Sequence, residues 1–167
     1  MSALEFYARV AISCDVLGAG VGDSPDSWEA ALGDDCLNVP GRGMLRRDHG
    51  LVEINFAPDQ LGRMSCVGFG VKTHRLLRDH SPQTVPAPLS QRYGTFARRL
   101  RYEELEAAVL AAGRVFELED ESRDVRRYRV PESRARVTVI VDPDPYGTGD
   151  PDPHSHRAGD VWSVDVW

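Results

Sequence analysis

Two stretches of the chain share one plan, in which a short helix that ends at a glycine precedes two strands joined through a proline–aspartate turn. The first covers residues 25–73 with its turn at Pro58-Asp59, and the second covers residues 102–166 with its turn at Pro143-Asp144. Amphipathic helices and alternating strands must each bury one face, so such units pack as two layers. The sequence therefore predicts an α+β fold, a two-layer, mainly antiparallel sheet from two helix-strand-strand repeats with the helices on one face.

Length and proline content predict how the two stretches are joined. The chain has 167 residues, which is long enough for one hydrophobic core. Residues 81–90 contain Pro82, Pro86 and Pro88, which favour an extended connection. We therefore expect residues 1–167 to form a single domain, with pseudo-repeat halves at about 1–80 and 90–167.

Capping residues predict three helices. Ser24 and Pro25 at one end and Gly33 at the other mark a helix over residues 25–32. A Glu-, Ala- and Leu-rich segment before Gly113 marks a second helix over residues 102–112. Ser2 and Glu5 fit a capping box for a helix over residues 3–13. Residues 3–13 also alternate in a way that would suit a strand, so the choice between helix and strand stays open there. The apolar members of that alternation are Phe6, Ala8, Val10 and Ile12.

Alternating polarity predicts the strands. Residues 51–56 place Val52, Ile54 and Phe56 inward, with Glu53 and Asn55 outward. Residues 67–73 place Val67, Phe69, Val71 and Thr73 on one face, and Gly68 and Gly70 form a side-chain-free trough on the other. Residues 137–141 predict a central strand, and residues 115–118 and 127–130 an additional hairpin. In the final strand, Trp162, Val164 and Val166 share one face and Ser163, Asp165 and Trp167 the other.

Charge and cysteine content exclude several classes of function. The net charge of −6 argues against nucleic-acid binding and favours basic partners. No apolar run is long enough to span a membrane, and the N-terminus lacks the features of a secretory signal, so we expect a cytoplasmic protein. Cys14, Cys36 and Cys66 are widely spaced, and their number is odd, which suggests neither a disulfide framework nor a zinc site. We expect no cofactor.

Candidate catalytic and metal-binding residues match no complete template. The segment 142–156 is rich in aspartate and histidine but lacks the glutamate of an EF-hand and is stiffened by prolines, so we expect no metal there. His49, His74 and Arg75 suggest an alternative function, a small enzyme acting on an anionic substrate. No glycine-flanked nucleophile accompanies them, and we expect no catalytic residues.

Tryptophans and acidic residues supply candidate partner contacts. Trp28 and Trp162 fall in phase with apolar neighbours and are expected in the core, whereas Trp167 lies on the polar face of the last strand. Asp34 and Asp35 follow a helix that is itself acidic, which would suit a basic partner.

Residues 20–33, 47–56 and 74–76, which include Gly22-Asp23-Ser24-Pro25, Asp48-His49-Gly50 and His74-Arg75-Leu76, resemble small actinobacterial proteins associated with polymorphic-toxin immunity. The resemblance covers about the first half of the chain. The opening G-D-x-x-x-x-W-x-x-x-L-G is also similar to the repeated unit of beta-lactamase-inhibitor-like and small outer-membrane lipoprotein folds. The chain lacks the signal and lipidation cysteine of those lipoproteins, and neither resemblance implies a catalytic residue.

The resemblance to immunity proteins implies a protein without enzymatic activity that binds a cognate toxin enzyme and occludes its active site. The toxin is expected to present a basic surface. Candidate contacts, listed in chain order, are Asp34, Asp35, Glu53, Asn55 and Trp167. The alternatives are the small enzyme described above and a homodimeric structural module that uses the glycine trough.

Overall fold

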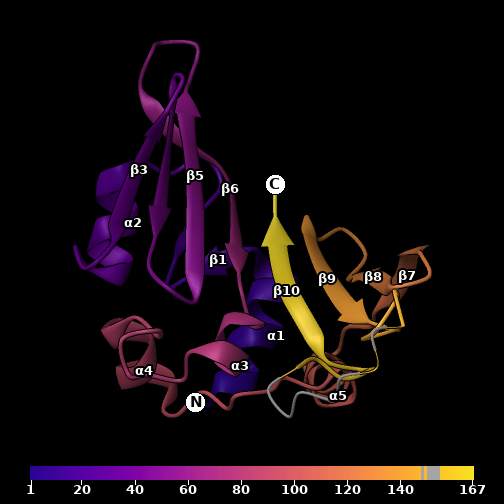
Figure 1. The fold of residues 1–167 in the computed structure, drawn as a ribbon. Helices are drawn as coiled ribbons and strands as arrows, with labels where there is room; N and C mark the ends of the chain where they lie inside the picture. Colours follow the sequence, from indigo (N-terminus) through magenta and orange to yellow (C-terminus); the bar gives the residue numbers. More distant parts are fainter. Residues whose placement is uncertain (148, 150–154) are drawn as a thin grey trace.

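A computed structural model describes residues 1–147, 149 and 155–167 (Figure 1). The helices are α1 (Ala3–Ser13), α2 (Pro25–Leu32), α3 (Arg75–Arg78), α4 (Ala87–Tyr93) and α5 (Tyr102–Ala111). A small hairpin pairs β1 (Asp15–Val16) with β2 (Ala19–Gly20). The main strands are β3 (Leu37–Gly41), β4 (Met44–Asp48), β5 (Val52–Pro58), β6 (Met64–Val71), β7 (Glu117–Glu121), β8 (Val125–Arg129), β9 (Ala135–Ile140) and β10 (Val161–Val166).

The eight main strands form one antiparallel sheet in the order β3-β4-β5-β6-β10-β9-β8-β7. The first half of the chain supplies the meander β3 to β6, and the second half supplies the meander β7 to β10. The two meanders meet where β6 pairs with β10 at the centre (Figure 1). The predicted α+β class and antiparallel sheet are confirmed, but the sheet is larger than two strands per half would give.

The strands missing from the sequence prediction lie at or next to the outer edges of the sheet. β3 and β4 follow α2 in a segment that looks like a polar loop. β3 is an edge strand exposed at most positions and needs no apolar alternation, and β4 beside it is mostly polar. At the other edge β7 and β8 form the additional hairpin, displaced by about two residues from its predicted position.

All three predicted helices are present. α1 and α2 have the expected N-caps, and α5 ends at Ala111, one residue before the predicted end. The capping box selects the helix over the strand for α1, since the Ser2 hydroxyl accepts from the Glu5 amide and the Glu5 carboxylate accepts from the Ser2 amide. In α2, Trp28 is fully buried as predicted and its ring lies 5.0 Å from that of Phe69.

The segment 81–90 was expected to be wholly extended, which is wrong. α4 begins within it, because prolines are tolerated in the first turn of a helix.

Two β-bulges change which side chains face the core. Opposite Asn55 and Phe56, the pairing skips Val67, which is 44% exposed, and Cys66 faces the core instead. In β10 the pairing skips Trp162, which is half-buried beside His74. The predicted inward positions of Val67 and Trp162 are therefore wrong, because each strand contains one more residue than strict alternation allows.

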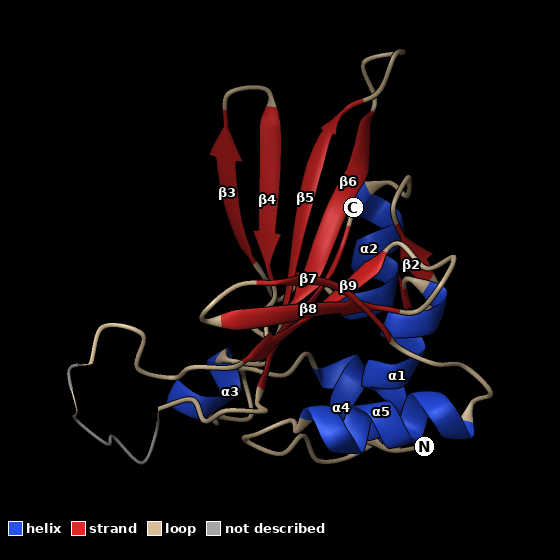
Figure 2. Ribbon diagram, turned by 90° about the vertical axis from the view of Figure 1, so that its right-hand side faces the viewer, coloured by secondary structure: helices blue, strands red, loops and turns tan. Residues whose placement is uncertain are grey.

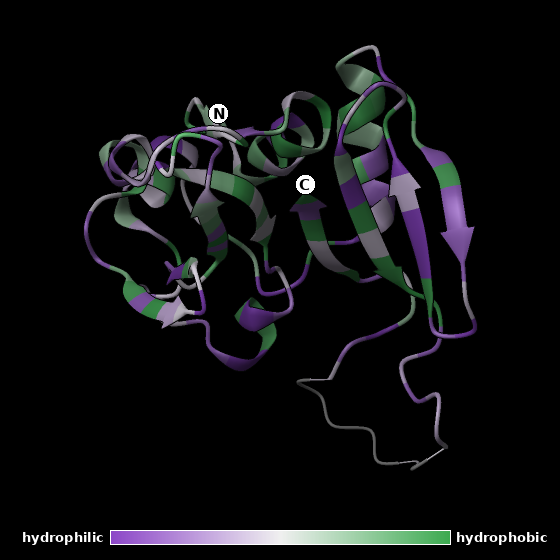
Figure 3. Ribbon diagram, turned by 90° about the horizontal axis from the view of Figure 1, so that it is seen from above, coloured by the Kyte–Doolittle hydropathy of each residue, from purple (hydrophilic) through white to green (hydrophobic). Residues whose placement is uncertain are grey.

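α1 and α2 cover one face of the sheet. α1 packs against β9 and β10 and α2 against β6, and Figures 2 and 3 show α1 and α2 on the same side of the strands. One hydrophobic cluster contains residues from both halves of the chain. Among the described residues, none of the helices combines the length and apolar character needed to cross a membrane. The sheet face opposite α1 and α2 is called the open face below.

Candidate functional site

Strand register places two neighbouring rows of residues on the open face. The first row crosses β4, β5, β6, β10 and β9 at Asp48, Glu53, Gly70, Asp165 and Arg136. The second row contains Arg46, Asn55 and Gly68, next to Trp167 at the end of β10. Three of the predicted contacts, Glu53, Asn55 and Trp167, therefore lie on one face of the sheet. Simple strand alternation was sufficient to find them.

Groups of the chain itself fill the glycine trough. The Lys72 ammonium lies 2.6 Å from the Asp165 carboxylate, and both groups occupy the space that a Cβ at Gly70 would need. At Gly68 a Cβ would lie 3.0 Å from the Val166 carbonyl oxygen and 3.3 Å from the Trp167 Cβ. The two glycines thus let β10 and its side chains approach closely, and the trough itself is not free for a second copy of the chain.

Arg75 links α3 to the first row of the open face. Its Nη1 donates to the Asp48 carboxylate at 2.7 Å and to the Gly50 carbonyl at 2.6 Å, and its Nη2 donates to the Glu53 carboxylate at 2.7 Å. The Glu53 side chain is only 16% exposed. Glu53 points away from the core as predicted, but its charge is already neutralised by Arg75 within the chain.

Trp167 is the most exposed of the predicted contacts on this face, with 53% of its surface open to solvent. The Arg134 Nε donates to the Trp167 carbonyl at 2.9 Å, and the Arg136 guanidinium lies 5.9 Å from the centre of the indole ring. Arg136 is held in turn by Glu119, at 2.5 Å. An exposed indole thus lies beside Arg136, which is itself fixed by Glu119, and the predicted exposure of Trp167 is confirmed.

Asp34 and Asp35 lie apart from the open face, between α2 and β3. Both are exposed, and neither carboxylate makes a hydrogen bond or ion pair with another described residue. They line a groove of about 780 Å³ between residues 32–37, 48–50 and 82–91. The predicted contact residues therefore divide between the open face and this groove.

His49 lines the same groove and is 96% buried, since only 4% of its surface is exposed. Neither ring nitrogen makes a hydrogen bond of good geometry within the described part of the chain, although the Asp35 carbonyl lies close enough to one of them to act as a weak acceptor. Burial, helped by the positive charge of Arg47, lowers the pKa of His49, while the nearby Asp35 carbonyl acts in the opposite direction. The imidazole is therefore neutral at pH 7, with one nitrogen available to accept a hydrogen bond.

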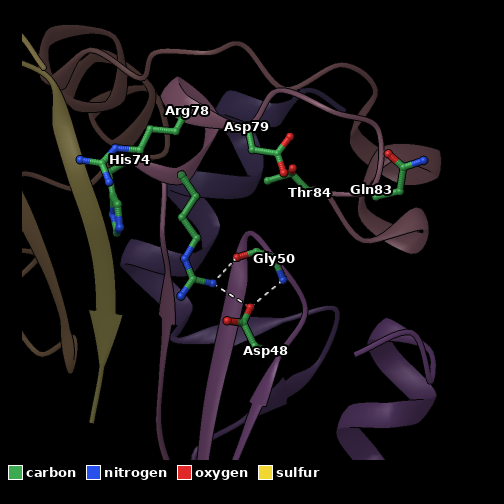
Figure 4. Close-up of a pocket in the computed structure, with 8 residues that line it drawn as sticks. Asp48, Gly50, His74, Arg78, Asp79, Gln83 and Thr84 are labelled. Atoms are coloured by element: carbon green, nitrogen blue, oxygen red, sulfur yellow. Dashed lines mark hydrogen bonds and ion pairs between the residues drawn. The ribbon is translucent and has the colours of Figure 1, made fainter. Parts of the chain in front are cut away.

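His74 and Arg75 line a different cavity, of about 490 Å³. Arg78 and Asp79 lie on its α3 side, and Asp48 and Gly50 on its strand side (Figure 4). The His74 ring stacks on Trp162 with centroids 4.2 Å apart, and its Nδ1 lies 3.0 Å from the Trp162 carbonyl oxygen. The structure thus places His49 in one hollow and His74 and Arg75 in the neighbouring one, and the two hollows share Asp48, Gly50 and Gln83.

The histidine stack beside β10 was not anticipated from the sequence. The His156 ring lies at a steep angle to that of Trp162, with ring centroids 4.3 Å apart, and Trp162 also stacks with His74. Burial lowers the pKa of both histidines, and for His156 the charge of His74 adds to this effect. The bulge at Trp162 creates this arrangement, and an alternating pattern carries no signal of a bulge.

Part of the segment 142–156 lies outside the described residues, including Asp150, Asp152 and His154. Within the part of the chain that is described, no group of three or more His, Cys, Asp or Glu side chains is arranged to hold a metal ion. Asp142 is engaged locally, since its carboxylate accepts from the Asp144 amide at 2.9 Å.

Comparison of the chain with protein-family models, with curated proteins and with solved structures gives no match in any of the three. The resemblances to immunity proteins and to lipoprotein-like repeats therefore stay sequence-based expectations. The function must be inferred from the open face, the groove and the residues that line them.

Proposed function

We propose that the protein is an immunity-type binding protein that neutralises a cognate toxin enzyme by occluding its active site or substrate path. The observation that carries this proposal is the exposed indole of Trp167 on a sheet face that α1 and α2 leave uncovered. Tryptophan is enriched among the residues that dominate binding energy at protein interfaces. Such a function requires a preformed complementary surface and no turnover.

The charge distribution supports a basic partner. The net charge of −6 favours encounter with a positively charged surface, and Asp34 and Asp35 offer carboxylates without a partner among the described residues. Glu53 is less suited to pairing with the toxin, since Arg75 already holds it. Asn55, beside Gly68 in the second row, remains a candidate neutral contact near Trp167.

We further propose that the halves at about 1–80 and 90–167 are repeats of one unit. Each half contributes a meander of four strands whose last strand lies at the centre of the sheet. The mirrored strand order, with β6 beside β10, supports a duplication in which the terminal strands became partners.

Affinity capture tests the binding function. The purified chain is immobilised and incubated with extract of the native cells, beside Trp167→Ala and a Leu61→Ala control. Leu61 is 75% exposed, in the turn between β5 and β6, so its truncation removes a similar exposed apolar group. We expect the wild-type chain and Leu61→Ala to retain one stoichiometric enzyme, and we expect that enzyme to lose its activity when the chain is added. Trp167→Ala should bind the same enzyme with an affinity lower by about tenfold or more.

Two results would overturn the proposal. One is the recovery of no stoichiometric partner from extract in which the protein is expressed. The other is a captured enzyme that keeps full activity when saturated with the chain. A purified chain that turned over a small anionic substrate, with loss of turnover in His74→Ala, would favour the enzyme alternative.

A further inference from the structure

The groove beside Asp34 and Asp35 has the charge of a cation site. Besides these two residues it is lined by Asp48, and none of its described lining residues is lysine or arginine. Asp48 is already paired with Arg75 at 2.7 Å, which leaves the other two carboxylates for an external cation. The opposite wall, between residues 82 and 91, is largely apolar and contains the three prolines of that segment.

Arg47 on β4, whose positive charge acts on His49, makes no ion pair with Asp34 or Asp35. Arg47 donates to the Asn38 side-chain oxygen at 3.0 Å and to the Pro25 carbonyl at 2.9 Å, and it lies 3.7 Å from the Glu29 carboxylate. Its guanidinium is thus held against α2. Asp34 and Asp35 therefore lack a counter-ion among the described side chains.

His49 supplies an independent sign that a ligand binds here. Buried polar groups in folded proteins are almost always hydrogen-bonded, and leaving one without a partner is unfavourable. The His49 ring nitrogen that accepts hydrogen bonds is buried, has no donor among the described residues, and belongs to a residue that lines the groove. A donor that entered from the groove would satisfy the imidazole nitrogen that accepts hydrogen bonds.

We propose that this groove receives an arginine side chain of the toxin, whose guanidinium pairs with Asp34 and Asp35 and donates a hydrogen bond to His49. The identity of the partner rests on the proposed function, whereas the chemistry of the site does not. Arginine fits better than lysine, because its planar group carries five donors in a fixed fork and packs flat against apolar walls. The Val85 and proline side of the groove supplies such a wall.

A blocked arginine tests the site without the toxin. N-acetyl-L-arginine methylamide is titrated into the isotope-labelled chain, and the ring signals of His49 and the amide signals of Asp34 and Asp35 are followed by NMR. The control ligand is N-acetyl-L-citrulline methylamide, which has nearly the same shape but no charge. We expect saturable shifts at these signals with arginine and at least tenfold weaker binding with citrulline.

Matched variants separate a specific site from general attraction. Asp34→Asn/Asp35→Asn removes two exposed carboxylates at the groove, and Glu103→Gln/Glu104→Gln removes two exposed carboxylates at the start of α5. We expect the first pair to weaken arginine binding at least tenfold and the second to leave it unchanged. Equal shifts with citrulline, shifts that spare His49, or equal losses in both variants would overturn the proposal.

The two proposals can fail separately. If blocked arginine binds as expected and affinity capture recovers no toxin, the groove stands and the immunity function falls. If a toxin is captured and inhibited, but arginine does not bind and Asp34→Asn/Asp35→Asn leaves capture unchanged, the groove proposal falls and the immunity function stands.

Discussion

Replacement of Arg75 by methionine should destabilise the protein more than its position in a short helix suggests. Arg75 donates to two carboxylates, each at 2.7 Å, and to the Gly50 carbonyl at 2.6 Å. Methionine keeps the apolar stem but removes all three hydrogen bonds. Asp48 and Glu53, which lie opposite each other in the register of β4 and β5, then repel each other.

The expected loss follows from the partial burial of these groups. The side chains of Arg75, Asp48 and Glu53 are 28%, 24% and 16% exposed, between the regimes of surface pairs and buried pairs. Surface pairs contribute about 0–1 kcal/mol, and removal of one partner of a buried pair costs about 3–5 kcal/mol. We therefore expect Arg75→Met to lose about 2–3 kcal/mol, which for a chain of this length lowers Tm by roughly 4–12 °C.

The measurement is urea unfolding followed by circular dichroism, with Arg78→Met as the matched control. Arg78 lies in the same helix, is exposed, and makes no hydrogen bond or ion pair with a described residue. Its replacement should change the free energy of unfolding by less than about 0.5 kcal/mol. If the two variants were equally stable, Arg75 would not link α3 to the sheet, and the reasoning would be refuted.

Three further predictions concern backbone conformation, thiol reactivity and pH. Gly50→Ala should lower the free energy of unfolding in urea by about 2 kcal/mol more than Gly62→Ala does. Both glycines have a positive φ, but only at Gly50 would a Cβ lie 2.4 Å from the Thr84 carbonyl oxygen. Equal losses in the two variants would contradict this prediction. Burial raises the pKa of the Cys66 thiol to about 11, so Cys66 should resist iodoacetamide at pH 8 until urea unfolds the chain, as read by mass spectrometry. Native labelling at the rate of a free thiol would refute that prediction. The pKa values of three histidines are lowered in the fold, namely His49, His74 and His156. The unfolded chain therefore binds protons at these histidines at a higher pH than the folded chain does, so the free energy of unfolding should be greatest above about pH 6.5 and fall as the pH drops below it. A urea midpoint that stays constant from pH 7.5 to 5.5 would contradict this prediction.

Local signals in the sequence were sufficient where a feature depends on neighbouring residues. The capping residues Ser2 and Ser24 placed the starts of α1 and α2, and alternation in residues 51–56 placed Glu53 and Asn55 on the outward face of β5. The exposure of Trp167 followed from the same alternation. Each of these features is determined by backbone geometry over a few residues, and sequence carries that information directly.

Features that depend on pairing between distant segments could not be predicted. The bulges at Val67 and Trp162 arise from the registers of β5 with β6 and of β9 with β10, which no single strand encodes. The two hollows depend on how residues 81–91 fold back over the end of the sheet, where Leu51 donates to the Thr84 carbonyl at 2.7 Å. Sequence reasoning therefore named His49 and Arg75 but placed them in one cluster.

The two edges of the sheet bear on how a partner would bind. Among the described residues, β3 pairs only with β4 and β7 only with β8, so each edge strand has one side without a neighbouring strand of the sheet. β3 contains Pro40, which lacks an amide hydrogen, and β7 is wholly exposed and acidic at four of its five positions. Proline and like charges oppose the addition of a further strand. A partner is therefore better accommodated by side-chain contacts with the open face and the groove than by extension of the sheet, which agrees with the placement of Trp167 at the end of the central strand β10.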